Sequence, residues 1–412
     1  MSPVTSGPTP DPRPAPRPGP RWSAFAVVAV IALSFNLRPV ATAVGPVLEE
    51  IRTALGMSES VAGILTALPG LVFGLVAGIA VVLVRRLGVT TTLVVALLTL
   101  IAGLVARAFA GHSGLLLVGT VVALAGAAVG NVLVPAFVKR HFPGREAGVM
   151  SAYAAALGAG ATVAALVSAP IAARAAGGWR TSLGVWGLVA FLALLPWLVL
   201  LVHERRVHSG PAPRPARLDG AMWRSRQAIA LAAFFGIQSM QAYVQFGWAP
   251  QMFRDAGLSA TYAGSLSGLI AAFGIPAGIV MPLVVARMRD LRPVMVALGA
   301  ILSVGYLGIL WAPTTVPWLW ATCLGLSACA FPAALALMTA RTRAPGITAK
   351  VSGFTQMVGY LFAAAGPFAV GALLQATGGW TVPLVLLALC GPVLAVAGSL
   401  AGRPHIIDDD LV

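Results

Sequence analysis

The chain has 412 residues, of which 58% are hydrophobic and 9% are charged, and its mean hydropathy is +0.91. Soluble globular proteins carry about 25% charged residues, so this composition excludes an ordinary soluble domain. The net charge of +15 would otherwise suggest a nucleic-acid partner. The basic residues, however, lie between apolar runs and are not interleaved with aromatic residues in one patch. We therefore expect a protein of the lipid bilayer that binds no nucleic acid.

Residues 1–21 begin the chain with a proline-rich segment that is poor in apolar side chains. Such a segment cannot bury a core, and we expect a disordered cytoplasmic tail. It does not read as a signal peptide, because the apolar run that follows is too long and has no small-residue cleavage pattern.

Twelve apolar runs follow, and each is long enough to cross a bilayer, which takes roughly 17–25 residues. Their approximate limits are 22–48, 60–84, 89–110, 114–138, 146–173, 179–202, 225–253, 259–286, 293–312, 316–340, 350–376 and 379–401. The predicted fold class is an all-α integral membrane protein with twelve transmembrane helices. Most of the 27 Lys and Arg residues fall in alternate connections, which by the positive-inside rule places both termini in the cytoplasm.

The two halves of the chain repeat each other. The segment GMS at 56–58 corresponds to GLS at 257–259, and GGW at 177–179 recurs at 378–380, a near-constant shift of about 200 residues. The basic, proline-rich stretch 203–224 reads as a cytoplasmic linker between a six-helix half at 22–202 and a second at 225–401. Residues 402–412 form the expected C-terminal cytoplasmic tail. A repeat of this length in a polytopic protein is typical of a secondary transporter, with its binding site between the halves near the midplane.

Arg38 is the one charged residue between Trp22 and Val47. It lies about 24 Å along a helix from Trp22, near or just beyond the middle of a hydrocarbon core about 30 Å thick. A charge at that depth is costly and usually faces the bundle interior or a wet cavity, so we interpret Arg38 as a binding-site residue. The alternative is a structural arginine that snorkels or pairs with a helix carbonyl.

The seventh run carries Gln238, Gln241, Gln245 and Trp248 at spacings of three, four and three residues. These spacings place the four side chains on one helical face. Amides in lipid would leave donors and acceptors unsatisfied, so this face is expected to line a cavity. Interhelical packing is the alternative, because glutamines also bridge membrane helices.

The eleventh run has Ser352, Gln356 and Tyr360 on one helical face, and their counterparts in the first half do not repeat the amide and the phenol. Asn131, four residues before Pro135, either supports the backbone near that proline or contacts substrate. The three cysteines lie inside apolar runs without metal-ligand spacing, and we interpret them as packing residues. We expect neither a metal site nor a cofactor.

No acidic residue falls in the middle of a predicted span. Arg38 therefore has no obvious counter-ion, and an anionic substrate could supply one, because a guanidinium recognises carboxylates and small oxyanions well. Alternatively, carbonyls and amides solvate Arg38, and it donates to a neutral heteroaromatic ligand. Proton coupling would then require an acid outside the cavity, a histidine, or a proton that travels with the substrate.

Several short motifs together resemble the cyanate/2-nitroimidazole porter family of the major facilitator superfamily over about residues 24–400. They are NLRP at 36–39, GP at 45–46, GNVLVPAFVKRHFPG at 130–144, QS at 238–239, WAP at 248–250, SGFTQ at 352–356 and TGGW at 377–380. The resemblance implies the major facilitator fold, two pseudo-symmetric six-helix halves and alternating access. It does not specify the substrate, because members move chemically different small molecules.

The chain departs from the wider superfamily at two places. The loop that often carries an acidic residue after the second helix reads RRLG at 85–88, and the Gly-Pro motif of proton-coupled drug antiporters is missing from the fifth run. Both differences argue against the drug-antiporter branch. A proton-driven drug or metabolite efflux antiporter is nevertheless the second hypothesis. A sensor is disfavoured because there is no output domain, and an enzyme because there is no nucleophile–base pair.

The sequence thus predicts a monomeric inner-membrane transporter of a small polar or anionic solute, either secondary active or facilitative. A cyanate-like anion, a small carboxylate and a nitro- or azole heterocycle are the candidate substrates, and protons are a candidate coupling ion. The predicted cavity lies between helices 1, 4, 7, 10 and 11. The predicted substrate-binding residues are Asn36, Arg38, Asn131, Gln238, Gln241, Gln245, Trp248, Phe331, Gln356 and Tyr360.

Overall fold

A computed structural model describes residues 20–142, 145–207, 220–343 and 345–410. Most of the predicted N-terminal tail 1–21 and most of the predicted linker 203–224 lie outside these residues. Every regular element in the described residues is a helix. The helices are α1 (Pro20–Leu37), α2 (Pro39–Thr42), η1 (Gly45–Val47), α3 (Leu48–Leu55), α4 (Glu59–Leu87), α5 (Val89–Ala108), α6 (Ser113–His141), α7 (Glu146–Arg174), α8 (Trp179–Val207), η2 (Gly220–Arg224), α9 (Arg226–Asp255), α10 (Ala260–Ala272), α11 (Gly274–Arg287), α12 (Arg292–Trp311), α13 (Pro317–Ser327), α14 (Ala330–Ala340), α15 (Pro345–Ala363), α16 (Ala365–Thr377), α17 (Thr381–Ala401) and η3 (Ile407–Asp410).

Eleven segments of the described chain are long and apolar enough to cross a membrane. The twelfth span is α9, whose 30 residues are also sufficient in length. Its composition is more polar because Gln238, Gln241, Gln245 and Gln251 lie on it, and all four are buried inside the protein. A helix shielded from lipid can carry amides that a lipid-facing helix could not. The predicted twelve-helix, all-α membrane fold is confirmed.

Four spans are interrupted within the bilayer, and a proline explains each interruption. In the first span, Pro39 directly follows the break at Arg38. In the eighth, tenth and eleventh spans, the second helical segment has a proline at its third residue, namely Pro276, Pro332 and Pro367. Proline lacks the N–H that would bond the carbonyl four residues earlier, and its ring clashes with that carbonyl. The first span is the most irregular, since it continues past Arg38 as α2, η1 and α3.

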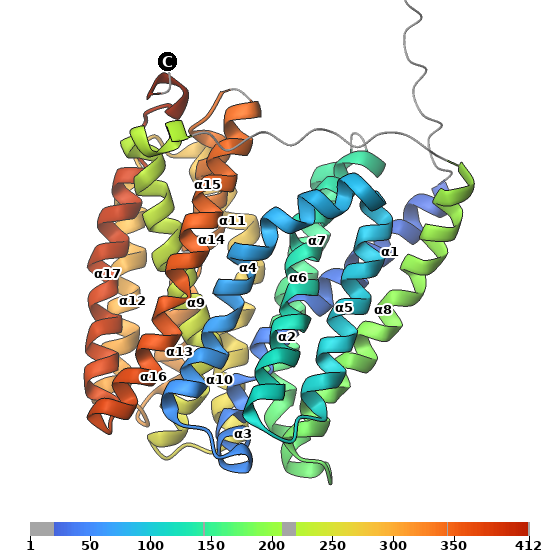
Figure 1. Ribbon diagram of the computed structural model, residues 1–412. Coiled ribbons are helices and arrows are strands. Elements are labelled where there is room, and N and C mark those ends of the chain that lie inside the picture. Colours follow the sequence, from blue (N-terminus) through green and yellow to red (C-terminus); the bar gives the residue numbers. More distant parts are fainter. Residues whose placement is uncertain (1–19, 143–144, 208–219, 344, 411–412) are drawn as a thin grey trace, which may run out of the picture.

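The helices form two groups that meet along one side. In Figure 1, α9, α12, α13 and α15–α17 lie on one side, and α1 and α5–α8 lie on the other. The repeat in the sequence has a structural counterpart where α4 and α10 begin. Ser58 Oγ accepts a hydrogen bond from Val61 N, and Ser259 Oγ accepts one from Tyr262 N, each at 3.3 Å. Both serines are N-caps, which satisfy free N–H groups at a helix start.

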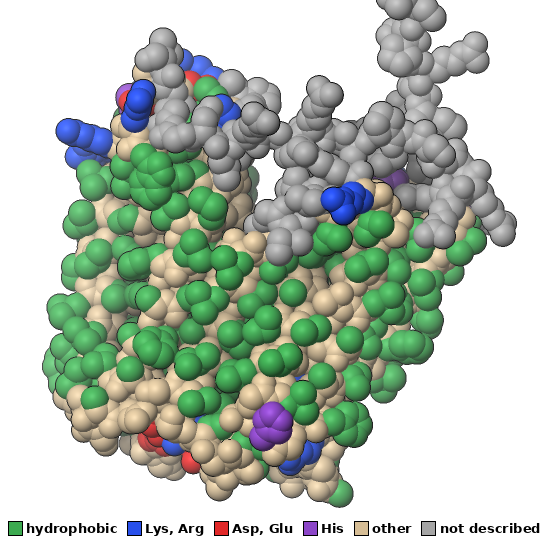
Figure 2. Space-filling model, viewed as in Figure 1, with side chains coloured by type: hydrophobic (Ala, Val, Ile, Leu, Met, Phe, Trp, Pro, Cys, Tyr) green, Lys and Arg blue, Asp and Glu red, His purple; other side chains and the backbone are tan. Residues whose placement is uncertain are grey.

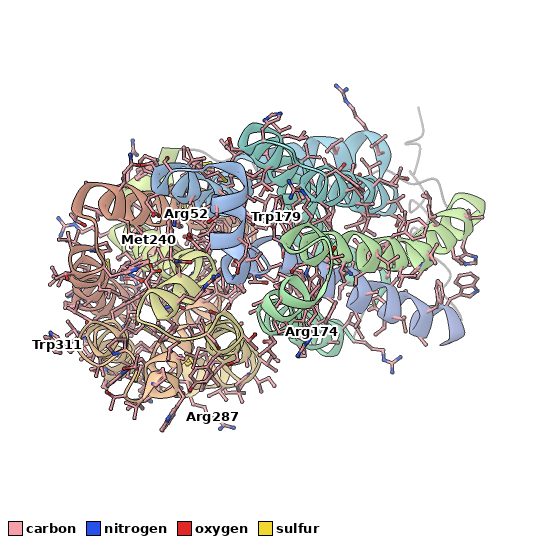
Figure 3. All side chains as sticks on the ribbon, turned by 90° about the horizontal axis from the view of Figure 1, so that it is seen from below. Arg52, Arg174, Trp179, Met240, Arg287 and Trp311 are labelled. Carbon is pink, nitrogen blue, oxygen red and sulfur yellow. The ribbon has the colours of Figure 1, made fainter. Side chains whose placement is uncertain are left out.

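The outer surface of the bundle is apolar along its length. Leu75, Leu188, Ile279 and Val396 are each more than 60% exposed, and Figure 2 shows hydrophobic side chains covering the visible side while charged residues gather at the two ends. Exposed apolar side chains in this number suit contact with lipid tails. Figure 3 shows Trp311 and Arg287 pointing away from the bundle at its periphery.

The C-terminal segment packs against the end of α14, the connection that follows it and the start of α9. Ile407 is fully buried and its N–H donates to the Arg341 carbonyl at 2.9 Å. Asp409 forms two hydrogen bonds with the Arg343 guanidinium, and Asp410 accepts a hydrogen bond from Ser225 at the start of α9. Residues 402–410, which belong to the predicted C-terminal tail, are therefore folded onto the bundle.

Candidate functional site

A cavity of about 510 Å³ lies between the two groups of helices. It begins at Arg38, where the first span is interrupted, and it extends to Ala286 and Ala340 near the last residues of α11 and α14. Most lining side chains are apolar, including those of Leu157 and Leu335. The arrangement is that of a binding pocket with few polar groups on hydrophobic walls.

Arg38 is the charged residue among the described residues that line this cavity, and its side chain is half-buried. The helix break places it there: α1 ends at Leu37, Arg38 is the N-cap of α2, and Pro39 starts the next turn. No ion pair joins Arg38 to an acidic residue within the described residues. Its guanidinium carbon instead lies 5.7 Å from the centroid of the Phe331 ring on α14. The cation is thus held against an aromatic face, which is an attractive contact.

Aromatic side chains form one wall beside Arg38. Phe331 packs on Phe235, whose ring centroid is 5.9 Å away, and Phe235 meets Tyr360 edge to face at 5.1 Å. Tyr360 also contacts Tyr243 at 6.3 Å. Phe331, Tyr243 and Tyr360 line the cavity, so two phenols and an apolar ring stand near the guanidinium.

Five of the ten predicted site residues line the cavity together. They are Arg38, Gln238, Gln245, Phe331 and Tyr360, which come from the first, seventh, tenth and eleventh spans. Gln238 Nε2 donates to Ser239 Oγ at 2.6 Å, and both residues face the cavity. The site therefore combines one cation with neutral hydrogen-bonding groups.

The other five predicted residues are not among those that line the cavity, and each has a partner in the protein. Gln241 Oε1 accepts from the Tyr306 hydroxyl at 2.7 Å, and Trp248 Nε1 donates to the Pro367 carbonyl at 3.1 Å. Asn36 Nδ2 donates to the Ala32 carbonyl, Asn131 Oδ1 accepts from the Tyr153 hydroxyl, and Gln356 Nε2 donates to Ser352 Oγ. In this conformation the binding role of these five stays a prediction.

The glutamine face of α9 divides because the helix turns about 100° per residue. Gln238 and Gln245, seven residues apart, differ by about 20° around the axis, whereas Gln241 and Trp248 lie about 60–80° to one side. The first pair faces the cavity, and the second pair faces α12 and α16. The spacing correctly grouped the four residues but covered an arc wider than the cavity.

The walls also include helices that the sequence did not predict. The fourth span contributes no lining residue among those described, while the fifth contributes Ala154 and Gly158 and the eighth contributes Ile270 and Gly274. These residues are small or apolar, so they carry no chemical signal in the sequence. Tyr243 and Ser239 are polar lining residues that were not selected as binding residues, although both lie in the seventh span near the glutamines.

The end of the bundle opposite Ala286 and Ala340 is closed by contacts between the two groups of helices. A Cβ on Gly45 would lie 2.2 Å from the Phe246 carbonyl oxygen, so the first and seventh spans are in backbone contact there. At this closed end Arg254 Nη1 pairs with Glu50 Oε2 at 2.9 Å, joining α9 to α3. Seen from this end, Arg52 lies where the two groups meet (Figure 3).

Comparison with known proteins decides the family. A family model described as the Major Facilitator Superfamily matches residues 24–367. The chain belongs to the major facilitator superfamily. It is 34% identical over 388 residues to an uncharacterized transporter, YycB, of Bacillus subtilis, covering 93% of this chain and 95% of that protein.

Two Escherichia coli relatives place this transporter within the superfamily. The 2-nitroimidazole transporter is 32% identical, covering 92% of this chain and 95% of that protein, and the cyanate transport protein CynX is 30% identical, covering 88% and 94%. The protein is thus a transporter of small solutes and not an enzyme, and the resemblance found in its motifs is confirmed.

Solved structures agree on the fold. A D-xylose–proton symporter matches with a TM-score of 0.73 at 16% identity, covering 94% of this chain and 98% of that one. A bacterial homologue of the lysosomal transporter Spinster also gives 0.73, at 15% identity, covering 95% of each chain. At this level of identity the likeness shows the fold alone.

Proposed function

We propose that this transporter carries a small anionic or strongly polar solute across the bacterial inner membrane by alternating access, with Arg38 as the principal binding group. The single observation that carries the proposal is the position of Arg38 in the cavity, with an aromatic ring against it and no ion pair among the described residues. A half-buried guanidinium is stabilised by an anion that forms charge-assisted hydrogen bonds with it. A carboxylate, cyanate or nitro group could each serve as that acceptor.

The neutral groups of the cavity would complete the site. Gln238, Gln245 and Tyr360 can donate to or accept from the solute, and Phe331 gives an apolar surface beside the charge. Arg38 and Gln245 belong to opposite groups of helices, so a solute bound by both would couple the two halves. Such a ligand stabilises the occluded arrangement more than either open one, which is the energetic requirement for alternating access.

We propose further that the cavity opens to the cytoplasm in this conformation. The open end carries Arg287 as the last residue of α11, and Arg341 and Arg343 just beyond α14. An excess of basic residues marks the cytoplasmic side. Both termini would then be cytoplasmic, and residues 22–202 and 225–401 would form the two moving halves. One chain contains the whole cavity, so we expect the transporter to work as a monomer.

Two relatives guide the choice of probes. One is named for 2-nitroimidazole and the other for cyanate, so these two compounds and benzoate, a small carboxylate, make the first panel. Purified protein in liposomes should take up at least one labelled probe faster than empty liposomes do, and unlabelled probe should compete. Uptake at the rate of empty liposomes for all three would reject these substrate classes.

The same liposomes separate the coupling modes. Carriage of an anion alone should respond to membrane potential, whereas co-transport with a proton should respond to an imposed pH gradient and collapse with a protonophore. If a probe leaves the liposomes only when an inward proton gradient is imposed, so that entering protons drive it out, the result would support the efflux antiporter instead.

A further inference from the structure

Arg107, near the end of α5, is a charged side chain in the protein interior that the proposed transport site does not use. It is fully buried, with 0% of its surface exposed. Its Nη1 donates to the Val40 carbonyl at 2.7 Å, while Nε and Nη2 have no hydrogen-bond partner. No ion pair to Arg107 exists among the described residues. A buried cation that keeps one strong hydrogen bond and leaves two donors unsatisfied costs stability.

The bond that Arg107 makes is to the irregular part of the first span. In a continuous helix the Val40 carbonyl would accept from the N–H of Val44. Here Val44 N donates to the Ala41 carbonyl at 3.4 Å instead, because α2 ends at Thr42. The Val40 carbonyl is thus left without its helical donor, and such a buried group needs another partner. The guanidinium of Arg107 takes that place from the neighbouring helix.

Val40 is two residues from Arg38, within the same single turn of helix. The Arg38 carbonyl accepts hydrogen bonds from Ala41 N at 3.0 Å and Thr42 N at 3.1 Å, so this turn fixes the backbone from which the Arg38 side chain projects. A contact that holds Val40 therefore also holds the direction of Arg38. Gly119 lets α6 approach the backbone of α5 closely at this point, because a Cβ there would be 2.9 Å from the Arg107 backbone nitrogen.

We propose that Arg107 is a positioning residue, which holds the interrupted turn of the first span so that Arg38 points into the cavity. The inference rests on the proposed role of Arg38 as the binding cation. It accounts for an otherwise unfavourable buried charge, since a leucine or methionine would fill the same space without the cost of desolvation. It also predicts that Arg107 affects the cavity only through Arg38, because Arg107 is not among the lining residues.

The test measures the electrostatic potential in the cavity and needs no substrate. Cys323, Cys329 and Cys390, the three cysteines of the chain, are replaced by alanine, and Ala242→Cys adds a reporter thiol on the cavity wall. Purified full-length protein reacts with an anionic reagent, sulfonatoethyl methanethiosulfonate, or a cationic one, trimethylammonioethyl methanethiosulfonate. The ratio of the two rates reports the positive charge that the thiol faces, and Arg38→Gln should lower this ratio about tenfold.

Arg107→Met should lower the ratio nearly as much as Arg38→Gln does, and it should add nothing in the Arg38→Gln background. This double-mutant cycle distinguishes action through Arg38 from a direct field of Arg107, which would add in both backgrounds. Arg107→Lys, which keeps a charge and one donor for the Val40 carbonyl, should restore most of the ratio. An unchanged ratio in Arg107→Met, or additive effects in the cycle, would overturn the proposal.

Thermal unfolding of the same variants separates positioning from stability. Arg107→Met should unfold near the wild-type temperature, because removal of the uncompensated buried charge offsets the loss of the donor to the Val40 carbonyl. If Arg107→Met unfolds earlier and Arg107→Gln, a polar neutral variant, unfolds earlier as well while both keep the wild-type rate ratio, the residue is only structural. Failure of the proposed substrates would leave this result intact, since a cavity that carries nothing still has a measurable potential.

Discussion

Arg38 and Phe331 belong to opposite halves of the transporter, and the guanidinium carbon of one lies 5.7 Å from the ring centroid of the other. Contacts of this kind are worth about 0.5–2 kcal/mol. Arg38 comes from the interruption of the first span and Phe331 from that of the tenth, so two proline-linked breaks create one site. The contact keeps the cation at the wall of the cavity, beside Tyr360.

Replacing Phe331 with leucine keeps an apolar side chain but removes the aromatic face. We expect the KM for the transported probe to rise about 2- to 30-fold, which corresponds to loss of the cation–π energy, while the maximal rate changes less. Initial uptake rates in liposomes over a range of probe concentrations give both constants. Phe368→Leu is the matched control, because Phe368 is 46% exposed on the outer surface; equal effects of the two variants would contradict the role of Phe331.

The close approach of Gly45 to Phe246 seals the end of the bundle opposite the cavity mouth. Gly45→Ala would place a Cβ 2.2 Å from the Phe246 carbonyl oxygen, so that end can close only after the backbones separate. We expect slower transport and a shift of the population toward the state open at that end. A Thr66→Cys reporter beside Gly247 in the same seal should react at least about fivefold faster with an impermeant maleimide.

The control for this prediction is Gly148→Ala, at a helical glycine whose added Cβ would have no neighbour within 4 Å. It should leave both transport and the labelling rate as in the wild type. If the Thr66→Cys reporter is labelled at the same rate in Gly45→Ala as in the wild-type background, the contact between Gly45 and Phe246 does not control closure of this end.

The ion pair between Glu50 and Arg254 joins the two halves at the same end. Both side chains are partly exposed, so the pair should contribute less than about 1 kcal/mol to the closed state. Glu50→Gln should raise labelling of the Thr66→Cys reporter by no more than about fivefold, and high salt should mimic it in the wild type. The reversed pair, Glu50→Arg with Arg254→Glu, should restore slow labelling, whereas additive increases from the two single changes would exclude a direct interaction.

Asp410 connects the C-terminal segment to the start of α9 through Ser225, and it also contacts His405. Although partial burial raises the pKa of Asp410, hydrogen bonds from Ser225 and His405 and the His405 charge outweigh it and hold the pKa below its usual value. A carboxyl with a depressed pKa contributes stability that is present above its unfolded pKa and is lost as pH falls through the folded pKa.

Asp410→Asn should therefore unfold at a slightly lower temperature than the wild type at about pH 6, and the difference should vanish toward about pH 3. Thermal unfolding of purified protein at several pH values measures this. Asp290→Asn, an exposed carboxyl at 65% side-chain exposure, is the control. A difference that stays constant across the range would mean that the Asp410 charge does not hold the segment.

The fold could be predicted from the sequence because each span shows itself in about 20 consecutive apolar residues, and the Lys and Arg residues of the connections indicate its orientation. The twelve spans follow from the cost of leaving backbone groups unpaired in lipid, which no local detail can override. Even α9, the most polar span, was identified as an apolar run, and its glutamine face was expected to line a cavity or to pack against other helices. The interruption at Arg38 was not predicted, although Pro39 directly after this arginine gives the physical reason for a break.

The site was only partly predictable because the direction of a side chain depends on neighbours that the sequence does not specify. Helical spacing grouped Gln241 with Gln245. It could not reveal that the Tyr306 hydroxyl of α12 would donate a hydrogen bond to Gln241. Arg107 was not singled out in the sequence, since it stands near the end of its apolar run. It is fully buried, and α6 approaches its backbone closely at Gly119, a contact between two helices that one sequence does not report.

The most direct test of the account is the uptake kinetics of Arg38 variants in liposomes. Using whichever of cyanate, 2-nitroimidazole or benzoate the wild type carries, Arg38→Gln should raise the KM about 10- to 150-fold, the loss expected for a charge-assisted hydrogen bond. The KM of Arg38→Lys should lie between those of the wild type and Arg38→Gln, because an ammonium keeps the charge without the planar donor pair. Arg174→Gln, at an exposed arginine on the periphery, should behave as wild type; wild-type KM values in both Arg38 variants would contradict the account.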